Sequence, residues 1–256
     1  MKGKLIVIDG LDGTGKQTQV DLLYKYLCSL SELDHKMIST KIDFPRYGKE
    51  SAHMVESYLQ GKFGTDPNVM DPYTASMFYA IDRSISYKTE LWGHVYNNGG
   101  LVIADRYSCS NFIHQASKLD NWNHPNSYIL HDFVKLLDWV YTTEHDNIGI
   151  PRPDLIIYLK SSEEANRKML EGRIKASQAA DIHEANNSYL NKCRTVLDNY
   201  EKHINFVTHN QCANTYQHID EIHHEFLRID DENFNIKSRE EIHEEIKEII
   251  YNHNLL

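Results

Sequence analysis

Short apolar runs alternate along this chain with longer segments in which apolar residues recur at helical spacing. Runs that are mostly apolar are typical of strands buried on both faces of a parallel sheet. Their alternation with helices predicts a doubly wound α/β fold. The predicted strands are Leu5 to Ile8, Met37 to Ile42, Leu101 to Ala104, Leu155 to Leu159 and Phe226 to Ile229. The predicted helices are Gln17 to Leu30, Met70 to Tyr96, Tyr128 to Tyr141, Ser162 to Arg173, Asp181 to Tyr200 and Ser238 to Tyr251.

Length and charge narrow the class of protein. The 256 residues fit one α/β domain with insertions. A formal net charge of -10 argues against a broad surface for nucleic acid or anionic membranes, because both need an accumulated positive field. No stretch approaches the ~20 apolar residues of a membrane span, and the N-terminal run lacks the pattern of a signal peptide. We therefore expect a cytoplasmic protein that binds neither nucleic acid nor membranes, with any nucleotide site in a local basic pocket.

Cysteine and histidine usage does not predict a transition-metal centre. The cysteines lack the close paired spacing of zinc or dithiol sites, which predicts reduced and mostly buried thiols. The 15 histidines are scattered through polar segments, which predicts solvated surface side chains. The cysteines are Cys28, Cys109, Cys193 and Cys212, and examples of the histidines are His218, His223 and His224.

The sequence Gly10-Leu-Asp-Gly-Thr-Gly-Lys16 lies between a predicted strand and a predicted helix. A phosphate-binding P-loop requires this context, because glycines let consecutive N–H groups converge on phosphate oxygens at a helix N-terminus. Lys16 would then reach the β- and γ-phosphates of ATP; the alternative is a Gly-rich turn without a ligand. Gln17 stands where the usual pattern has a magnesium-binding Ser or Thr, and spacing leaves open whether Thr18 binds magnesium or phosphate. The predicted ATP-binding residues are Gly10, Leu11, Asp12, Gly13, Thr14, Gly15, Lys16, Gln17 and Thr18.

A pair of opposite charges follows the predicted strand Leu101 to Ala104. Asp105 ends this strand, and in P-loop proteins such an acid commonly holds the magnesium shell, although it can also form a turn or cap a helix. Arg106 follows at once, and charges at the carboxyl edge of a parallel sheet face the crevice where ligands bind. With the P-loop, this pair predicts a phosphotransferase in which Asp105 holds Mg²⁺, through water.

These motifs together resemble the thymidylate kinases, a family of P-loop nucleoside-monophosphate kinases. The resemblance covers roughly residues 2–200 and implies a three-layer fold, with a five-stranded parallel sheet, helices on both faces and a mobile lid. It implies Mg²⁺-dependent transfer of phosphate from ATP to dTMP, and a homodimer formed through the helices after strands two and three. The motifs that carry it, besides the P-loop, are Asp43-Phe-Pro-Arg46, Met77-Phe-Tyr-Ala-Ile-Asp-Arg83, Asp105-Arg-Tyr-Ser-Cys-Ser-Asn111, Pro153-Asp-Leu-Ile-Ile-Tyr-Leu159 and Asp181-Ile-His-Glu184.

The resemblance also implies roles for single residues. Asp12 would bind the deoxyribose 3′-hydroxyl, and Arg46 would bind the acceptor phosphate. Tyr79 would stack on the base, and Arg83, one helical turn later, would reach a base carbonyl. The amide of Asn111 would read the base edge. The predicted acceptor site comprises Asp12, Phe44, Arg46, Tyr79, Arg83, Arg106, Ser110, Asn111, His114 and Gln115.

Two departures from the family pattern affect these expectations. His114 stands where many members have Tyr or Phe near the sugar, so it would either exclude a 2′-hydroxyl or mark a pocket for another nucleotide. Gly13 stands where some members place a P-loop arginine, and members without that arginine take one from the lid. Arg173 is the candidate, although an arginine at a helix end is often a solvated C-terminal charge. The predicted catalytic residues are Lys16, Asp105, Arg106 and Arg173.

The resemblance implies a single P-loop kinase domain over residues 1–256. Its lid is expected at about 171–184, with extra length relative to the family at about 121–150 and 204–256. One alternative function is a kinase of another deoxynucleoside monophosphate or of a free nucleoside, and a phosphate-binding Arg46 argues against the nucleoside. The other is a P-loop protein that binds nucleotide without turnover. Retention of Lys16, Asp105 and Arg106 argues against that alternative.

Overall fold

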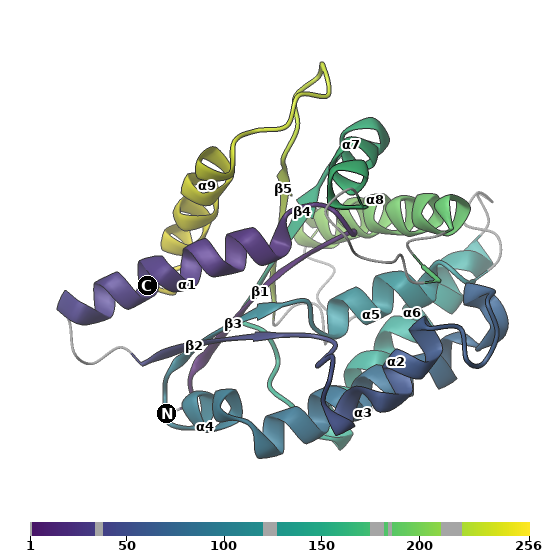
Figure 1. Cartoon of the computed structure of the whole chain (residues 1–256), viewed down its shortest axis with the longest axis horizontal. Helices are drawn as coiled ribbons and strands as arrows, with labels where there is room; N and C mark the ends of the chain where they lie inside the picture. The colour runs from purple at the N-terminus through teal and green to yellow at the C-terminus, as the bar shows by residue number, and fades with distance from the viewer. Residues whose placement is uncertain (1, 34–37, 120–126, 175–181, 184–185, 211–221) are drawn as a thin grey trace.

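Five parallel strands form the centre of the molecule (Figure 1). They are β1 (Lys4–Gly10), β2 (Ser39–Asp43), β3 (Leu101–Asp105), β4 (Leu155–Lys160) and β5 (His223–Arg228), in the order β2-β3-β1-β4-β5. The computed structural model describes residues 2–33, 38–119, 127–174, 182–183, 186–210 and 222–256. All five predicted strands are confirmed, and so is the α/β class.

Helices surround this sheet. The α-helices are α1 (Lys16–Leu33), α2 (His53–Leu59), α3 (Pro72–Thr89), α4 (Leu91–Asn97), α5 (Ser108–Ala116), α6 (Ser127–Tyr141), α7 (Glu163–Ile174), α8 (Asn187–Asn210) and α9 (Arg239–Asn252). Two short 3₁₀ segments, η1 (Glu50–Ala52) and η2 (Pro67–Val69), flank α2, and a π-helical segment, η3 (Thr142–Asn147), continues α6. No helix in the described segments is long and apolar enough to span a bilayer.

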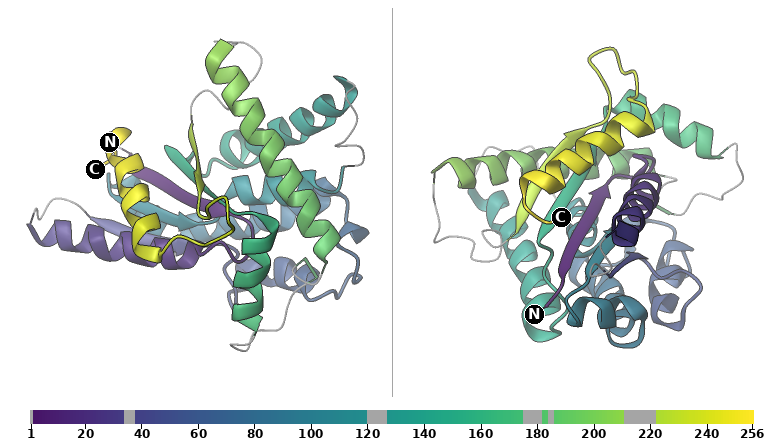
Figure 2. Two further views of the ribbon diagram at one scale, coloured as in Figure 1. Left: turned by 90° about the horizontal axis from the view of Figure 1, so that it is seen from above. Right: turned by 90° about the vertical axis from the view of Figure 1, so that its left-hand side faces the viewer.

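Alternate residues of the central strands pack on opposite faces of the sheet, as strand geometry dictates. Ile6 and Ile8 of β1 pack against α1 and α9, while Leu5 and Val7 belong to the core formed with α4, α5, α6 and α8. Figure 2 shows α9 lying beside α1 on one side of the sheet. The result is the three-layer arrangement that the sequence predicts.

Several element boundaries differ from the prediction. The single helix predicted over Met70 to Tyr96 is two helices, because Glu90 adopts an extended backbone between α3 and α4. Asp71 caps α3 by accepting N–H groups of the first turn, so the helix begins at the following proline. Helix α5 was not predicted as a helix. Strand β5 begins three residues before the predicted run, because this edge strand is half exposed and carries polar residues.

The cysteine prediction holds for the residues that the structure describes. Cys109 and Cys193 are buried free thiols, and Cys28 is a partly exposed one. Cys212 lies outside the described residues, as does His218.

The sheet sets the position of the site through its register. Ile8 of β1 lies opposite Asp105, and Asp105 lies opposite Asp43 at the end of β2. The P-loop leaves β1 two residues later, so the ends of three neighbouring strands meet at one edge. This carboxyl edge is where open α/β sheets bind ligands.

Candidate active site

The carboxyl ends of β1, β2 and β3 border a cavity of about 800 Å³. It is lined by Asp12, Gly13, Gly15, Lys16, Gln17, Thr18, Asp43, Phe44, Pro45, Tyr47, Leu59, Tyr79, Arg83, Asp105, Arg106, Tyr107, Ser110, Asn111, His114, Met169 and His183. Most of the predicted site residues therefore meet in one cavity. Among the predicted residues whose side chains the structure describes, those outside its lining are Gly10, Leu11, Thr14, Arg46 and Gln115.

The P-loop has the backbone that a phosphate cradle needs. Gly10 has a φ of 138°, and a Cβ built on it would lie 2.4 Å from the carbonyl oxygen of Leu159, so no side chain fits there. The hydroxyl of Thr14 donates to the carbonyl of Leu11 at 2.9 Å. Gly10 and Thr14 thus fix the conformation of the loop without lining the cavity. Gly13 and Gly15 line the cavity with their backbone.

Lys16 begins α1 and is only 6% exposed. Its Nζ donates to the carbonyl of Leu11 at 2.7 Å. Burial and the nearby Arg106 cation lower the pKa of Lys16 to about 8, even though the carboxylates of Asp12 and Asp105 raise it. At neutral pH Lys16 therefore remains a cation at the cavity wall, held within a few ångströms of the loop carbonyls.

Arg106 lies next to this cradle in a strained backbone conformation. Its φ of 66° is in the left-handed region, and its N–H donates to the carbonyl of Ile8 at 3.1 Å. The guanidinium pairs with Asp12 and lies 3.4 Å from the carbonyl oxygen of Gly10. Burial raises the pKa of Asp12, but the Arg106 and Lys16 cations outweigh burial and hold that pKa well below its usual value. Asp12 is therefore an anion at physiological pH.

Asp105 has the chemistry of a magnesium ligand. Its Oδ1 atom is buried and has no hydrogen-bond partner among the described residues. Thr18 and Gln17 line the same cavity. Within the described part of the chain, no group of three or more His, Cys, Asp or Glu side chains could hold a metal ion. Mg²⁺ commonly takes one or two carboxylates, and completes its shell with phosphate oxygens and water, so these residues fit it.

The predicted base-binding residues also line this cavity. Tyr79 and Arg83 come from α3 and Asn111 from α5, and all three line the cavity. Asn111 is 3% exposed and Gln115, one helical turn later, is fully buried. In the described structure, neither the oxygen nor the nitrogen of either amide has a hydrogen-bond partner. Buried amides without partners are costly, so Asn111, which lines the cavity, indicates a place for the polar edge of a ligand, whereas Gln115 lies outside the lining. Ser110 differs, because its hydroxyl donates to Asp9.

Two buried histidines also line the cavity, and one of them was not predicted. The rings of His114 and His183 stack with centroids 5.4 Å apart. The hydroxyl of Tyr58 lies 3.0 Å from Nε2 of His183. Burial lowers the pKa of His114 to about 4 and that of His183 further below its usual value, so both are neutral at pH 7. The expectation of solvated histidines is wrong for the buried His183 and His145, and for His224, whose ring nitrogens are buried, because a polar local sequence does not reveal tertiary packing.

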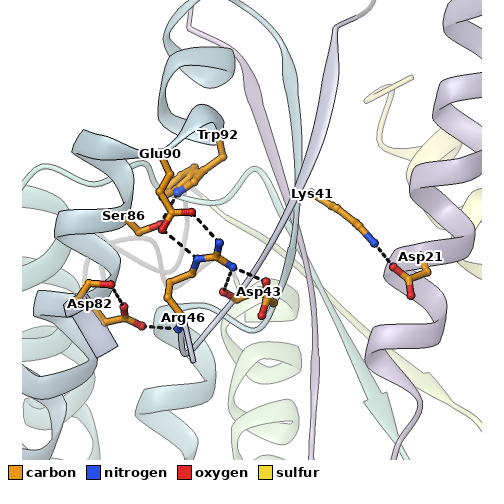
Figure 3. A network of polar contacts seen from close by, with 9 residues as sticks. Asp21, Lys41, Asp43, Arg46, Asp82, Ser86, Glu90 and Trp92 are labelled. Carbon is orange, nitrogen blue, oxygen red and sulfur yellow. Dashed lines mark hydrogen bonds and ion pairs between the residues drawn. The ribbon is translucent and has the colours of Figure 1, made fainter. Parts of the chain in front are cut away.

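Arg46 is not among the residues that line the cavity, and its side chain reaches Glu90 and Asp43 (Figure 3). Its guanidinium forms two hydrogen bonds with Glu90, at 3.1 and 2.7 Å, and also pairs with Asp43. Its backbone N–H donates to Asp82 at 2.8 Å. The neighbouring Tyr47 lines the cavity instead. The role of Arg46 toward an acceptor phosphate stays a prediction.

Other lining residues were not singled out from the sequence. They are Asp43, Pro45, Tyr47, Leu59, Tyr107, Met169 and His183. Asp43, Pro45, Tyr107 and His183 lie inside motifs that were recognised, so the motifs were their signal. Leu59 and Met169 reach the cavity only through the packing of α2 and α7. Arg173 falls in the last turn of α7, and its side chain lies outside what the structure describes. Of the expected lid, residues 175–181 and 184–185 lie outside the described residues as well.

A family model described as thymidylate kinase matches residues 8–226. The chain belongs to the thymidylate kinase family. Among its relatives, thymidylate kinase of Dictyostelium discoideum is 28% identical over 65% of this chain and 63% of that protein. The Mycobacterium tuberculosis enzyme is 30% identical over 66% of this chain and 71% of its own length. The chain thus covers less than two thirds of the first of these relatives.

The solved structures show the same fold. Thymidylate kinase from Candida albicans superposes with a TM-score of 0.65 at 20% identity, covering 99% of this chain and 93% of that one. At this level of identity the likeness concerns the fold. It agrees with the P-loop nucleoside-monophosphate kinase architecture that the family resemblance implies.

Proposed function

We propose that this chain is a dTMP kinase, which transfers the γ-phosphate of ATP to dTMP. The observation that carries the proposal is a single cavity lined both by a phosphate cradle and by the unpartnered buried amide of Asn111. Lys16 and the P-loop glycines suit a triphosphate. Asn111 offers both a donor and an acceptor, as the N3–H and a carbonyl of thymine require. Membership of the thymidylate kinase family supports the same assignment.

The mechanism follows from charge and position. The acceptor phosphate attacks the γ-phosphorus in line, so the protein must align two anions and neutralise charge. Lys16 and Arg106 supply fixed cations, and Arg173 is the candidate for a third. Asp12 is held ionised by Arg106, which suits an acceptor for the 3′-hydroxyl of the sugar. Asp105, with Thr18, would hold Mg²⁺, which supplies further neutralisation of the phosphates.

The lowered pKa of Lys16 predicts how ATP capture depends on pH. Below about pH 8 Lys16 is charged, and above it the charged fraction of the free enzyme falls about tenfold per pH unit. We expect kcat/KM for ATP to fall with a slope approaching about -1 above this pH, because kcat/KM reports the free enzyme. Lys16→Arg should be less active but should lack this slope, since arginine stays charged. A wild-type profile that is flat up to about pH 10 would contradict the assignment.

A comparison of acceptors tests the proposed function directly. We expect dTMP to be the best acceptor, with dUMP lower by about 10-fold or more because it lacks one methyl group. Cytosine would set an amine against the Arg83 donor and leave buried groups unpaired, so dCMP should be lower by at least about 100-fold. Purine monophosphates should also be poor. Competition kinetics with MgATP and the five monophosphates measures these ratios.

Other outcomes of that comparison would change the proposal. The Candida albicans enzyme is described as having broad substrate specificity, so the ratios must be measured for this chain. Preference for dCMP or a purine would leave a kinase of another deoxynucleotide, with His114 the first residue to examine. Binding of ATP without transfer to any acceptor would favour a P-loop protein that has lost turnover.

Three further expectations belong to this proposal. One domain over 1–256, with a lid at about 171–184, remains a prediction. The homodimer also remains a prediction. Ile81 and Ile85 of α3 are exposed one helical turn apart and could contribute to its interface. The cytoplasmic location also stays a prediction.

A further inference from the structure

Arg83 is fixed by a carboxylate that the sequence did not single out. Its Nε donates to Oε2 of Glu144 at 2.6 Å and its Nη2 donates to Oε1 at 2.7 Å. Both side chains are only 2% exposed. Such a two-point pair defines the plane and direction of the guanidinium, which a single contact would leave free to rotate.

This pair leaves Nη1 of Arg83 outside the contact with Glu144. Nη1 lies 3.5 Å from the carbonyl oxygen of Tyr107, at the long limit for a hydrogen bond. The Arg83 Cζ atom lies 6.0 Å from the centre of the Tyr107 ring, which borders the cavity. Because Glu144 takes the N–H of Nε and one N–H of Nη2, both N–H groups of Nη1 and the second one of Nη2 are not used by the carboxylate, and Nη1 is the nitrogen with two donors for a base carbonyl.

The π-helical turn η3 explains how Glu144 reaches this position. In η3, Glu144 and His145 are both buried. The carbonyl of Glu144 accepts the N–H groups of Gly149 and Ile150, each at 3.1 Å. His145 lies 3.1 Å from the hydroxyl of Ser108 at the start of α5. The turn is thus tied to both helices that carry base-facing residues, and single π-turns of this kind are frequent at functional sites.

We propose that Glu144 is a positioning residue for base recognition, acting through Arg83 to aim its Nη1 at the carbonyl of a pyrimidine. The inference rests on the proposed dTMP kinase activity and deepens it. Glu144 itself is not among the residues that line the cavity. Loss of Glu144 should therefore weaken binding of the acceptor base and leave ATP binding at the P-loop unchanged.

A purely structural role is the competing explanation. Removing one partner of a buried ion pair destabilises a protein, whereas replacing both partners is often neutral. Stability and substrate recognition can therefore be separated. Full-length Glu144→Gln, Arg83→Gln and the double variant would be compared with Glu144→Asp, which keeps the charge but shortens its reach. Asp146→Asn is the matched control, because it removes a charge from a solvent-exposed ion pair in the same turn.

The measurements are kcat and KM for dTMP and ATP, the preference for dTMP over dCMP, and the melting temperature. For Glu144→Gln and Glu144→Asp we expect KM for dTMP to rise about 10- to 100-fold, with a reduced preference over dCMP. KM for ATP and kcat should change little. In the double variant the melting temperature should recover above that of either single variant, while KM for dTMP stays as high as in Arg83→Gln. Asp146→Asn should match the wild type.

Different failures have different meanings. If the wild type does not phosphorylate dTMP, the proposed function itself is wrong. If it does, and both Glu144 variants keep a wild-type KM and preference, Glu144 has no positioning role. Equal losses toward dTMP and ATP, in step with the loss of melting temperature, would assign Glu144 to stability alone.

Discussion

Lys16→Ala is expected to lower kcat by about 100-fold or more while leaving the protein folded, because fixed charges at a transferring phosphoryl group commonly contribute that much. Lys16 is buried at the cavity wall, bonded only to the loop carbonyl of Leu11 in the contacts described. Its loss removes no ion-pair partner, so the stability cost should be small. Steady-state kinetics with MgATP and dTMP, together with a melting curve, measures both effects.

Lys41→Ala provides the control for this experiment. Lys41 on β2 forms an ion pair with Asp21 on α1 (Figure 3). Both side chains are substantially exposed to solvent. Exposed ion pairs contribute roughly 0 to 1 kcal/mol, so this variant should keep wild-type kcat and nearly wild-type stability. Turnover by Lys16→Ala close to that of the control would remove the P-loop from the proposed mechanism.

The parts of the fold that could be predicted are those encoded locally. Each buried strand is a continuous apolar run because both faces of the sheet are covered. The P-loop could also be predicted, because Gly10 to Lys16 contain the glycines, the lysine and the helix start in one stretch. Magnesium ligation by Asp105 was only suggested by its place at a strand end. The structure adds a buried carboxylate oxygen without a described partner.

The rest of the site depends on contacts between distant segments. Glu144 and Arg83 are 61 residues apart, and nothing in the local sequence pairs them. The break between α3 and α4 was missed because Leu91 and Trp92 continue the helical spacing across Glu90. Glu90 instead takes an extended backbone and binds Arg46, which is not among the residues that line the cavity. Tertiary interactions of this kind override a local pattern.

Arg106→Lys should lower kcat by about 100-fold or more, although it keeps the positive charge. A non-glycine residue in the left-handed region costs on the order of 1 to 3 kcal/mol, and Arg106 keeps that conformation next to the P-loop. The planar guanidinium can pair with Asp12 and still offer donors to two phosphate oxygens, whereas a lysine is one point charge. The lysine would still face Asp12, so the buried carboxylate keeps a cation nearby and the fold should be retained.

Arg152→Lys is the control, because it makes the same change in another ion pair. Arg152 pairs with Asp146, and this pair is partly exposed and lies outside the cavity lining. Its kcat should therefore equal that of the wild type. The readout is kcat with saturating MgATP and dTMP, accompanied by the melting temperature of each variant. A large loss of kcat in Arg106→Lys at an unchanged melting temperature is the result we expect, since donors to the reacting phosphates are then missing from a folded protein. Full turnover by this variant would mean that a point charge beside Asp12 is sufficient for phosphate transfer, and that the planar guanidinium has no special role.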